Sequence, residues 1–109
     1  MGITKTEGYS TQQVELAELL KAIAHPARIA ILQQIIATQQ CICNDLVQEL
    51  PLSQASVSQH LKALKQAEII KGSISGSSIC YCINEPVWRK LNQACEGLFN
   101  SYLNSENCC

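Results

Sequence analysis

Cysteine is the residue type in this chain with the clearest capacity for chemistry. Seven cysteines occur among 109 residues. They fall in four places, which are Cys41 with Cys43, Cys80 with Cys82, Cys95, and Cys108 with Cys109. An odd number fits poorly with a closed disulfide framework, so metal or redox chemistry is the better interpretation.

The Cys-x-Cys pair at Cys41 and Cys43 is the main candidate for metal binding. Two thiolates this close can hold one thiophilic ion, and a position at the start of a helix lowers the pKa of a thiol. Cys108 and Cys109 are candidates for further ligands, because six extended residues after Tyr102 can span about 20 Å. One tail thiolate completes the three-sulfur pyramid suited to trivalent arsenic or antimony. Both tail thiolates would instead give a four-sulfur set suited to zinc or cadmium.

The remaining cysteines are interpreted mainly as packing residues. Cys80 and Cys82 alternate with Ile79, Tyr81 and Ile83, so they share one face of an expected strand. We expect them to be small, half-buried strand residues, with a second soft-metal pair as the alternative. Cys95 lies on the apolar seam of the last expected helix and is expected to pack there.

A second group of candidate residues lies on the polar face of residues 53–66. Glutamine can pair with adenine, serine can contact bases or phosphates, and lysine neutralises phosphate. We assign base readout to Gln54, Ser56 and Gln59, and mixed or backbone contacts to Ser58, His60 and Lys62. Lys71 is expected to approach the neighbouring DNA backbone or minor groove. The alternative for each residue is a solvated polar surface.

The charge distribution is compatible with specific DNA binding. The whole chain has a net charge of −1, which argues against indiscriminate coating of nucleic acid. Residues 53–72 nevertheless carry Lys62, Lys65 and Lys71 against Glu68 alone. With so few cations, each subunit should neutralise few phosphates, so affinity should depend on dimerisation.

The elements that position these residues can be read from periodicity and helix signals. Apolar spacing and Pro26 predict helices over residues 11–24 and 26–38, and shorter patterns predict helices over 41–50 and 53–66. A period of two at 69–71 and 78–83 flanks a Gly/Ser stretch, residues 72–78, which we expect to be a loop or hairpin tip. A last helix is expected over 86–103. The predicted fold class is mainly α with a small β-hairpin, a winged helix-turn-helix with five helices and a two-stranded wing.

The chain is expected to form one domain with two short extensions. Residues 1–10 are expected to be a flexible N-terminal segment, 11–103 the DNA-binding and dimerisation domain, and 104–109 a cysteine-containing tail. In the last helix the seam has spacings of three and four residues and contains Trp88, Leu91, Cys95, Leu98 and Tyr102. We interpret this seam as a homodimer interface, with intramolecular core as the alternative.

The chain resembles the ArsR family of bacterial arsenic- and metal-sensing repressors over residues 11–103. The resemblance is carried by LLKAIAHPARIAIL at residues 19–32 and by LSQASVSQHLKAL at residues 52–64. The second stretch is similar to the DNA-reading helix of that family. The resemblance implies a winged-helix homodimer that binds a palindromic operator and is released by an inducer.

The resemblance also bears on the inducer. The stretch from Cys41 to Leu46, CICNDL, is similar to the family's arsenic or soft-metal motif, with one residue inserted before Asp-Leu. Val47 stands where the family's best-known arsenic version has a further cysteine, so a third thiolate must come from elsewhere. Some members hold zinc between their last helices with histidine and carboxylate ligands. Residues 84–103 contain no histidine, which favours a thiophilic inducer here.

We therefore predict a cytoplasmic transcriptional repressor that binds double-stranded operator DNA and is released by arsenite or antimonite, with no obligatory cofactor and no membrane partner. One alternative keeps the repressor but makes the signal cadmium, lead or zinc. Another makes it reactive sulfur or oxidation, through a dithiol switch between Cys41 or Cys43 and Cys108 or Cys109. A thiol enzyme is disfavoured, because no Cys-x-x-Cys motif, phosphate loop or catalytic triad pattern is present. The composition, 47% hydrophobic and 16% charged, excludes global disorder.

Overall fold

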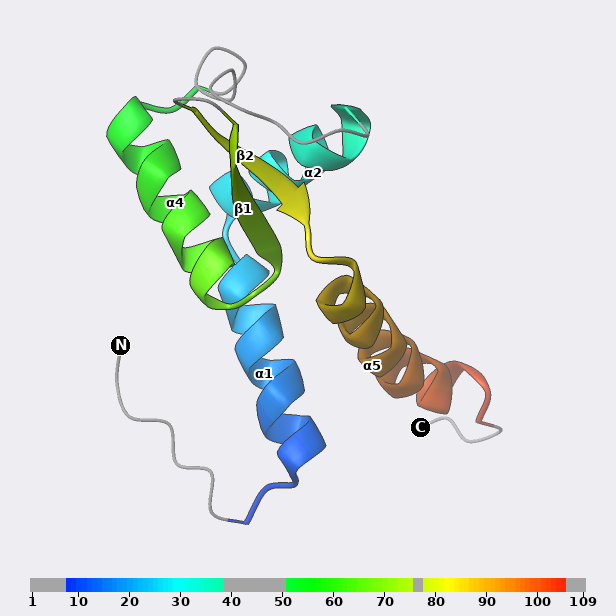
Figure 1. The fold of residues 1–109 in the computed structure, drawn as a ribbon. Helices are drawn as coiled ribbons and strands as arrows, with labels where there is room; N and C mark the ends of the chain where they lie inside the picture. Colours follow the sequence, from blue (N-terminus) through cyan, green and yellow to red (C-terminus); the bar gives the residue numbers. More distant parts are fainter. Residues whose placement is uncertain (1–7, 39–50, 76–77, 106–109) are drawn as a thin grey trace.

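Four helices and one hairpin make up the described part of the chain. The computed structural model describes residues 8–38, 51–75 and 78–105 (Figure 1). In chain order these residues form α1 (Thr11–Ile23), α2 (Pro26–Thr38), α4 (Gln54–Gln66), β1 (Ile70–Ser75), β2 (Ser78–Ile83) and α5 (Glu85–Leu103). No helix in these ranges is both long and apolar enough to cross a membrane.

The predicted fold class is confirmed at the level of a mainly helical chain with a two-stranded antiparallel hairpin. The helices predicted at 11–24, 26–38, 53–66 and 86–103 are all present, with bounds that differ by at most one residue. The described residues therefore contain four helices rather than the five predicted. The fifth, expected over residues 41–50, lies outside the described residues.

The helix starts have clear local causes. The Ser10 hydroxyl accepts a hydrogen bond from the Gln13 N–H at 3.1 Å, and the Gln13 side chain accepts one from the Ser10 N–H at 2.9 Å. This reciprocal capping box satisfies two backbone donors at the start of α1. Ser53 caps α4 by accepting from the Ser56 N–H, as expected of a serine that precedes a helix.

The strands of the hairpin are longer than the sequence pattern suggested. The prediction of a loop over residues 72–78 is therefore wrong for residues 72–75 and 78, which belong to the strands. β1 continues through Gly72 to Ser75 and pairs with β2 in the register Gly72 to Tyr81 and Ser73 to Cys80. Glycine and serine are poor strand formers, but pairing with β2 overrides that preference. A Cβ atom at Gly72 would lie 3.4 Å from the Nζ atom of Lys65, so glycine suits a strand that lies this close to α4.

The core lies where α2, α4 and the hairpin meet. Ile31, Leu64 and Ile69 have no exposed surface, and Ile70 has almost none. Val57 and Leu61 are also buried, which confirms the inward face predicted for residues 53–66. Burying each such side chain contributes about 1.5–3 kcal/mol to folding. This packing fixes α4 with its opposite face toward solvent.

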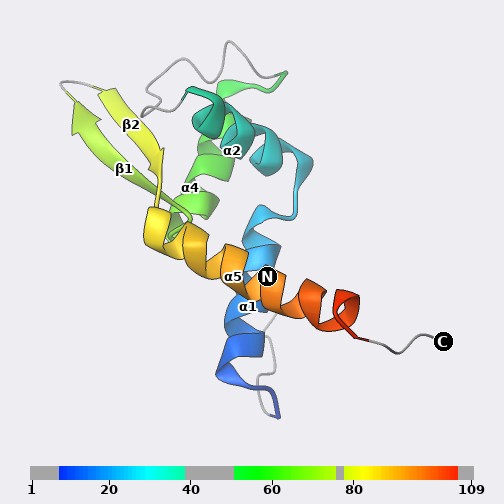
Figure 2. The same ribbon diagram turned by 90° about the vertical axis from the view of Figure 1, so that its right-hand side faces the viewer.

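Helix α5 begins directly after β2 and leads away from the core, as Figure 2 shows. It packs against α1, and the Lys90 ammonium lies 2.9 Å from the Glu15 carboxylate. Leu91 is the buried residue of α5. The hairpin, which we call the wing, and α5 therefore follow each other with Asn84 between them.

The turn between α4 and β1 is a Schellman motif with an unusual residue at its centre. Glu68 has φ of 63°, the left-handed region that favours glycine. The Glu68 N–H donates to the Lys65 carbonyl, and the Ile69 N–H donates to the Leu64 carbonyl. The Asn84 side chain then donates to the Glu68 carbonyl at 2.8 Å. The turn that ends α4 thus contains a residue with a strained backbone, Glu68. The hydrogen bond from Asn84 ties this turn to the residue that follows the wing.

We expect Glu68→Gly to stabilise the protein by about 0.5–1 kcal/mol, because glycine adopts this φ without a Cβ clash. Urea denaturation followed by circular dichroism measures the change. Glu68→Ala is the matched control, since it removes the carboxylate but keeps the Cβ. A gain in Glu68→Ala equal to that in Glu68→Gly would show that charge, and not backbone strain, is responsible.

Candidate nucleic-acid interface and thiol residues

The solvent face of α4 carries most of the residues predicted to contact DNA. Successive helix residues are rotated by about 100°, so Gln59 and Lys62 lie opposite the buried Val57, Leu61 and Leu64. Of the predicted residues, Gln54, Ser58, Gln59, Lys62 and Lys71 are exposed, whereas Ser56 and His60 are half-buried. α4 therefore presents a continuous polar face whose orientation is set by the core behind it.

Ser56 belongs to the first turn of α4 and takes part in its cap. The Ser53 hydroxyl donates to the Ser56 hydroxyl oxygen at 3.1 Å, and the Ser56 N–H donates to the Ser53 oxygen at 3.2 Å. The Ser56 hydroxyl keeps its own proton available for a further acceptor. Its position is therefore compatible with a DNA contact near the start of the helix.

His60 has a second role that the sequence pattern did not indicate. The Arg28 Nε–H donates to the Nδ1 atom of His60 at 3.2 Å, so this nitrogen is unprotonated and the ring is in the Nε2–H tautomer when neutral. The ring of His25 lies with its centroid 4.5 Å from that of His60. Desolvation, followed by the nearby His25 and Arg28, lowers the pKa of His60 below its ordinary value.

Arg28 joins three helices at this point. Its Nη1 atom donates to the Ala22 carbonyl in α1 at 2.8 Å, while its Nε atom holds His60 in α4. The Nδ1 atom of His25 accepts from the Ala27 N–H and so caps α2. Sequence reasoning did not identify Arg28, because 32 residues separate it from His60 and no local spacing connects them.

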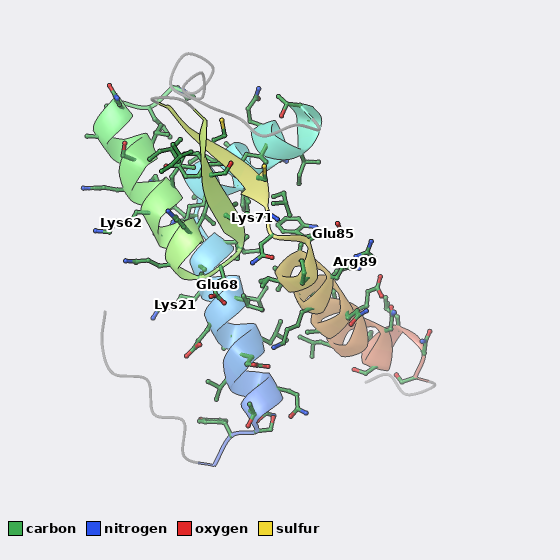
Figure 3. All side chains as sticks on the ribbon, in the orientation of Figure 1. Lys21, Lys62, Glu68, Lys71, Glu85 and Arg89 are labelled. Carbon is green, nitrogen blue, oxygen red and sulfur yellow. The ribbon has the colours of Figure 1, made fainter. Side chains whose placement is uncertain are left out.

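Lys71 lies apart from the polar face of α4. It pairs with Cys82, next to the base of the hairpin rather than its turn. Figure 3 shows Lys62 projecting from the outer side of α4, whereas Lys71 lies on the wing toward Glu85. A DNA contact by Lys71 therefore requires the backbone to pass close to the base of the wing.

The cysteines of the described residues differ in chemical state. Cys95 is a free thiol at a half-buried position. Cys80 is buried, Cys82 is half-buried, and both are disulfide-bonded. The expectation that these two are small strand residues with partial or full burial is confirmed, and their disulfide-bonded state is a feature that the expectation did not include. The ligands predicted at Cys41, Cys43, Cys108 and Cys109 lie outside the described residues.

The described residues alone hold no group of three or more histidine, cysteine or carboxylate side chains that could bind a metal ion.

The apolar seam predicted along α5 is only partly buried. Leu91 is buried, and Trp88 and Cys95 are half-buried, but Leu98 and Tyr102 are exposed. The first half of the seam thus packs within the subunit, and the second half remains open.

Comparison with known proteins shows the same architecture elsewhere. The chain aligns over 94% of its length with the solution structure of the homodimeric winged helix-turn-helix domain of Mb0332 from Mycobacterium bovis, covering 99% of that chain. The TM-score is 0.63 at 19% sequence identity, which establishes a shared fold. The protein is therefore a winged-helix protein.

Sequence comparison then gives the family. The family model described as bacterial regulatory protein, arsR family, matches residues 25–71. The arsenical resistance operon repressor of Staphylococcus xylosus is 30% identical over 79 residues, which cover 72% of this chain and 75% of that protein. The chain belongs to the ArsR family.

A relative from Mycobacterium tuberculosis is more similar over a shorter region. The HTH-type transcriptional repressor SmtB is 47% identical over 64 residues, which cover 59% of this chain. The matched region spans about half the length of this relative, 47%.

We expect acid to destabilise the protein through His60. A lowered pKa means that the unfolded chain takes up a proton that the folded protein resists, so stability is complete above about pH 6.5 and falls as the pH drops below it. Urea denaturation between about pH 7.5 and about pH 5.5 measures this loss. His60→Asn keeps an acceptor near Arg28 but cannot titrate, so its loss should be smaller. Equal pH dependence in both proteins would contradict the assignment.

Proposed function

We propose that this chain is a DNA-binding transcriptional repressor that acts as a homodimer and leaves its operator when trivalent arsenic or antimony binds its cysteine thiolates. The observation that carries the DNA-binding part is the exposed polar face of α4 opposite a fully buried apolar face. A helix held in this way can enter the major groove without losing its packing.

The residues of α4 divide into two roles. Gln54, Ser56 and Gln59 read base edges, while Ser58 and Lys62 contact phosphates. His60 retains its Nε2–H for a phosphate oxygen, because Arg28 occupies only its Nδ1 atom. Lys71 adds a backbone contact from the wing. This set is small, so two subunits must bind together to give useful affinity.

The second half of α5 supplies the dimer interface. Its exposed apolar side chains form what we call the α5 apolar end, made of Leu98, Phe99, Tyr102 and Leu103. An apolar cluster of this kind is stabilised by burial against a second copy. The related fold of Mb0332 is described as homodimeric, which supports the same assembly here.

The inducer is assigned from ligand chemistry. Cys41, Cys43 and the tail pair Cys108 and Cys109 are the candidate thiolates, and arsenite exchanges its three hydroxyl groups for three sulfur ligands with release of water. The relative from Staphylococcus xylosus is named as an arsenical resistance repressor, which supports this choice. Cadmium, lead or zinc would use the same thiolates.

A second candidate signal is oxidation or reactive sulfur. It would use a dithiol switch between Cys41 or Cys43 and Cys108 or Cys109, and the disulfide-bonded state of Cys80 and Cys82 supports thiol oxidation as a signal in this chain. We infer neither an obligatory cofactor nor an enzymatic activity. Because the proposed partner is operator DNA, we assign the protein to the cytoplasm.

We expect arsenite to raise the operator dissociation constant about 5–150-fold, the usual range of allosteric coupling. Fluorescence anisotropy of the reduced protein on its own upstream DNA, at fixed salt, measures this. Cys41→Ser, Cys43→Ser and a chain ending at Asn107 should lose the response. Cys95→Ser, at a free thiol of α5, is the matched control and should keep it. An arsenite-insensitive complex that cadmium or polysulfide disrupts would reject arsenite as the inducer, and no binding to any tested DNA would reject the repressor.

We expect Leu98→Glu to weaken dimerisation at least about tenfold, because a carboxylate would be buried against a second copy. Sedimentation velocity over a concentration series measures the monomer–dimer equilibrium. Ile74→Glu is the matched control, since Ile74 is 83% exposed but lies on the wing. A wild-type protein that stays monomeric, or equal weakening by both substitutions, would contradict an interface at the α5 apolar end.

A further inference from the structure

The fold brings the two histidines of this chain together from distant parts of the sequence. His25 lies at the junction between α1 and α2, and His60 lies in the middle of α4. Both α1 and α2 contact α4, and Figure 1 shows their junction beside that helix. The ring centroids of the histidines are 4.5 Å apart, with the ring planes tilted by 41°. The two rings therefore form one cluster, which we call the histidine pair.

Hydrogen bonds fix the tautomer of both rings. The Ala27 N–H donates to the Nδ1 atom of His25 at 3.0 Å, and the Arg28 Nε–H donates to the Nδ1 atom of His60 at 3.2 Å. A ring nitrogen that accepts a hydrogen bond carries no proton, so each neutral ring has its proton on Nε2. Both rings therefore offer an N–H donor. This arrangement suits an anion rather than a metal ion, which would bind an unprotonated nitrogen.

Arg28 adds a fixed positive charge beside these donors. Its guanidinium donates to the Ala22 carbonyl at 2.8 Å and to His60, so two contacts hold it in place. Desolvation, and then the basic groups His25 and Arg28, lowers the pKa of His60, so its ring is neutral at about pH 7.5. Two N–H donors next to a guanidinium are well suited to a phosphate oxygen.

The histidine pair is accessible from solvent at the edge of the polar face of α4. His25 is exposed and His60 is half-buried. His60 follows Ser56 by four residues, so the two lie on the same side of the helix. A recognition helix in the major groove is bordered by the phosphates of both strands. The histidine pair thus lies where one row of phosphates would pass if α4 entered the groove.

We propose that His25 and His60 together hold one phosphate of the operator backbone through their Nε2–H groups, with Arg28 as the positioning residue that fixes the ring of His60. This rests on the proposed function and extends the DNA-binding surface from α4 to the junction of α1 and α2. The spacing of the rings allows them to donate to different oxygens of the same phosphate. Such a contact contributes affinity and register, and base preference stays with α4.

The first test assigns the contact to a single phosphate. Fluorescence anisotropy on the protein's own upstream DNA, at fixed salt and about pH 7.5, is repeated with duplexes that carry one uncharged methylphosphonate at a time. Asparagine can accept from the N–H two residues on, so His25→Asn keeps the Ala27 contact but lacks the Nε2–H donor. It should raise the dissociation constant at least about fivefold on unmodified DNA. One methylphosphonate that weakens the wild type should have no further effect on this variant.

Gln93→Ala is the matched control, because it removes an exposed polar side chain from α5, away from the histidine pair. It should keep the wild-type affinity and the wild-type response to every methylphosphonate. Equal methylphosphonate responses in the wild type and His25→Asn would overturn the phosphate contact while leaving a DNA-binding repressor intact. A wild type that binds none of the tested DNA would instead reject the proposed function, and the contact with it.

A second test examines the positioning role of Arg28. Arg28→Lys keeps the charge but loses the planar fork that joins Ala22 to His60. The nitrogen-15 NMR signals of the imidazole rings report the tautomer. They should show an unprotonated Nδ1 in His60 of the wild type and a mixture of tautomers in Arg28→Lys, with weaker operator binding and an unchanged circular dichroism spectrum. An unchanged tautomer together with unchanged affinity would overturn this role.

Inorganic phosphate distinguishes the DNA backbone from a free anion as the ligand. At matched ionic strength, phosphate should shift the NMR signals of both histidines far less than the operator does. Saturable binding of phosphate by the wild type, lost in His25→Asn and without any histidine shift on addition of DNA, would assign the histidine pair to a free anion. That result would overturn the backbone contact.

Discussion

The structure depends first on the packing of α2 and α4 against the base of the wing. Ile31, Leu64, Ile69 and Ile70 are excluded from solvent, and they lie in α2, in α4, in the turn after α4 and at the start of β1. Apolar burial has no preferred direction by itself. Here it acts on a helix with one apolar face, so the polar face of α4 must point outward. The recognition surface is thus a consequence of where the core lies.

Polar contacts at the edge of this core fix the orientation of α4, which apolar packing alone leaves undetermined. Arg28 holds a carbonyl of α1 and the ring of His60, and Asn84 holds the turn that follows α4. Hydrogen bonds have fixed geometry and a cost when broken, so these contacts select one arrangement among several that would bury similar area. The middle of α4 and the turn that follows it are therefore held by residues outside the helix.

Local chemistry explains which parts could be predicted from the sequence. Pro26 and Ser53 mark helix starts through rules that act within one turn, and the inward residues of α4 follow from its period. The extent of β1 could not be predicted, because Gly72 and Ser73 form a strand only through pairing with β2. The Arg28–His60 bond and the disulfide-bonded state of Cys80 and Cys82 likewise depend on contacts that no local pattern encodes. The helix expected at 41–50 stays a prediction.

The junction at Asn84 has a consequence for how this fold can vary. Because β2 and α5 are successive parts of one backbone with a single residue between them, the rotational setting of α5 relative to the wing is fixed by chain length. Inserting one residue there would turn the exposed apolar side of α5 by about 100° and so redirect a partner helix docked on it. Insertions at this point should therefore be poorly tolerated, whereas the sequence beyond Leu103 can lengthen without disturbing the relative phase of the two elements.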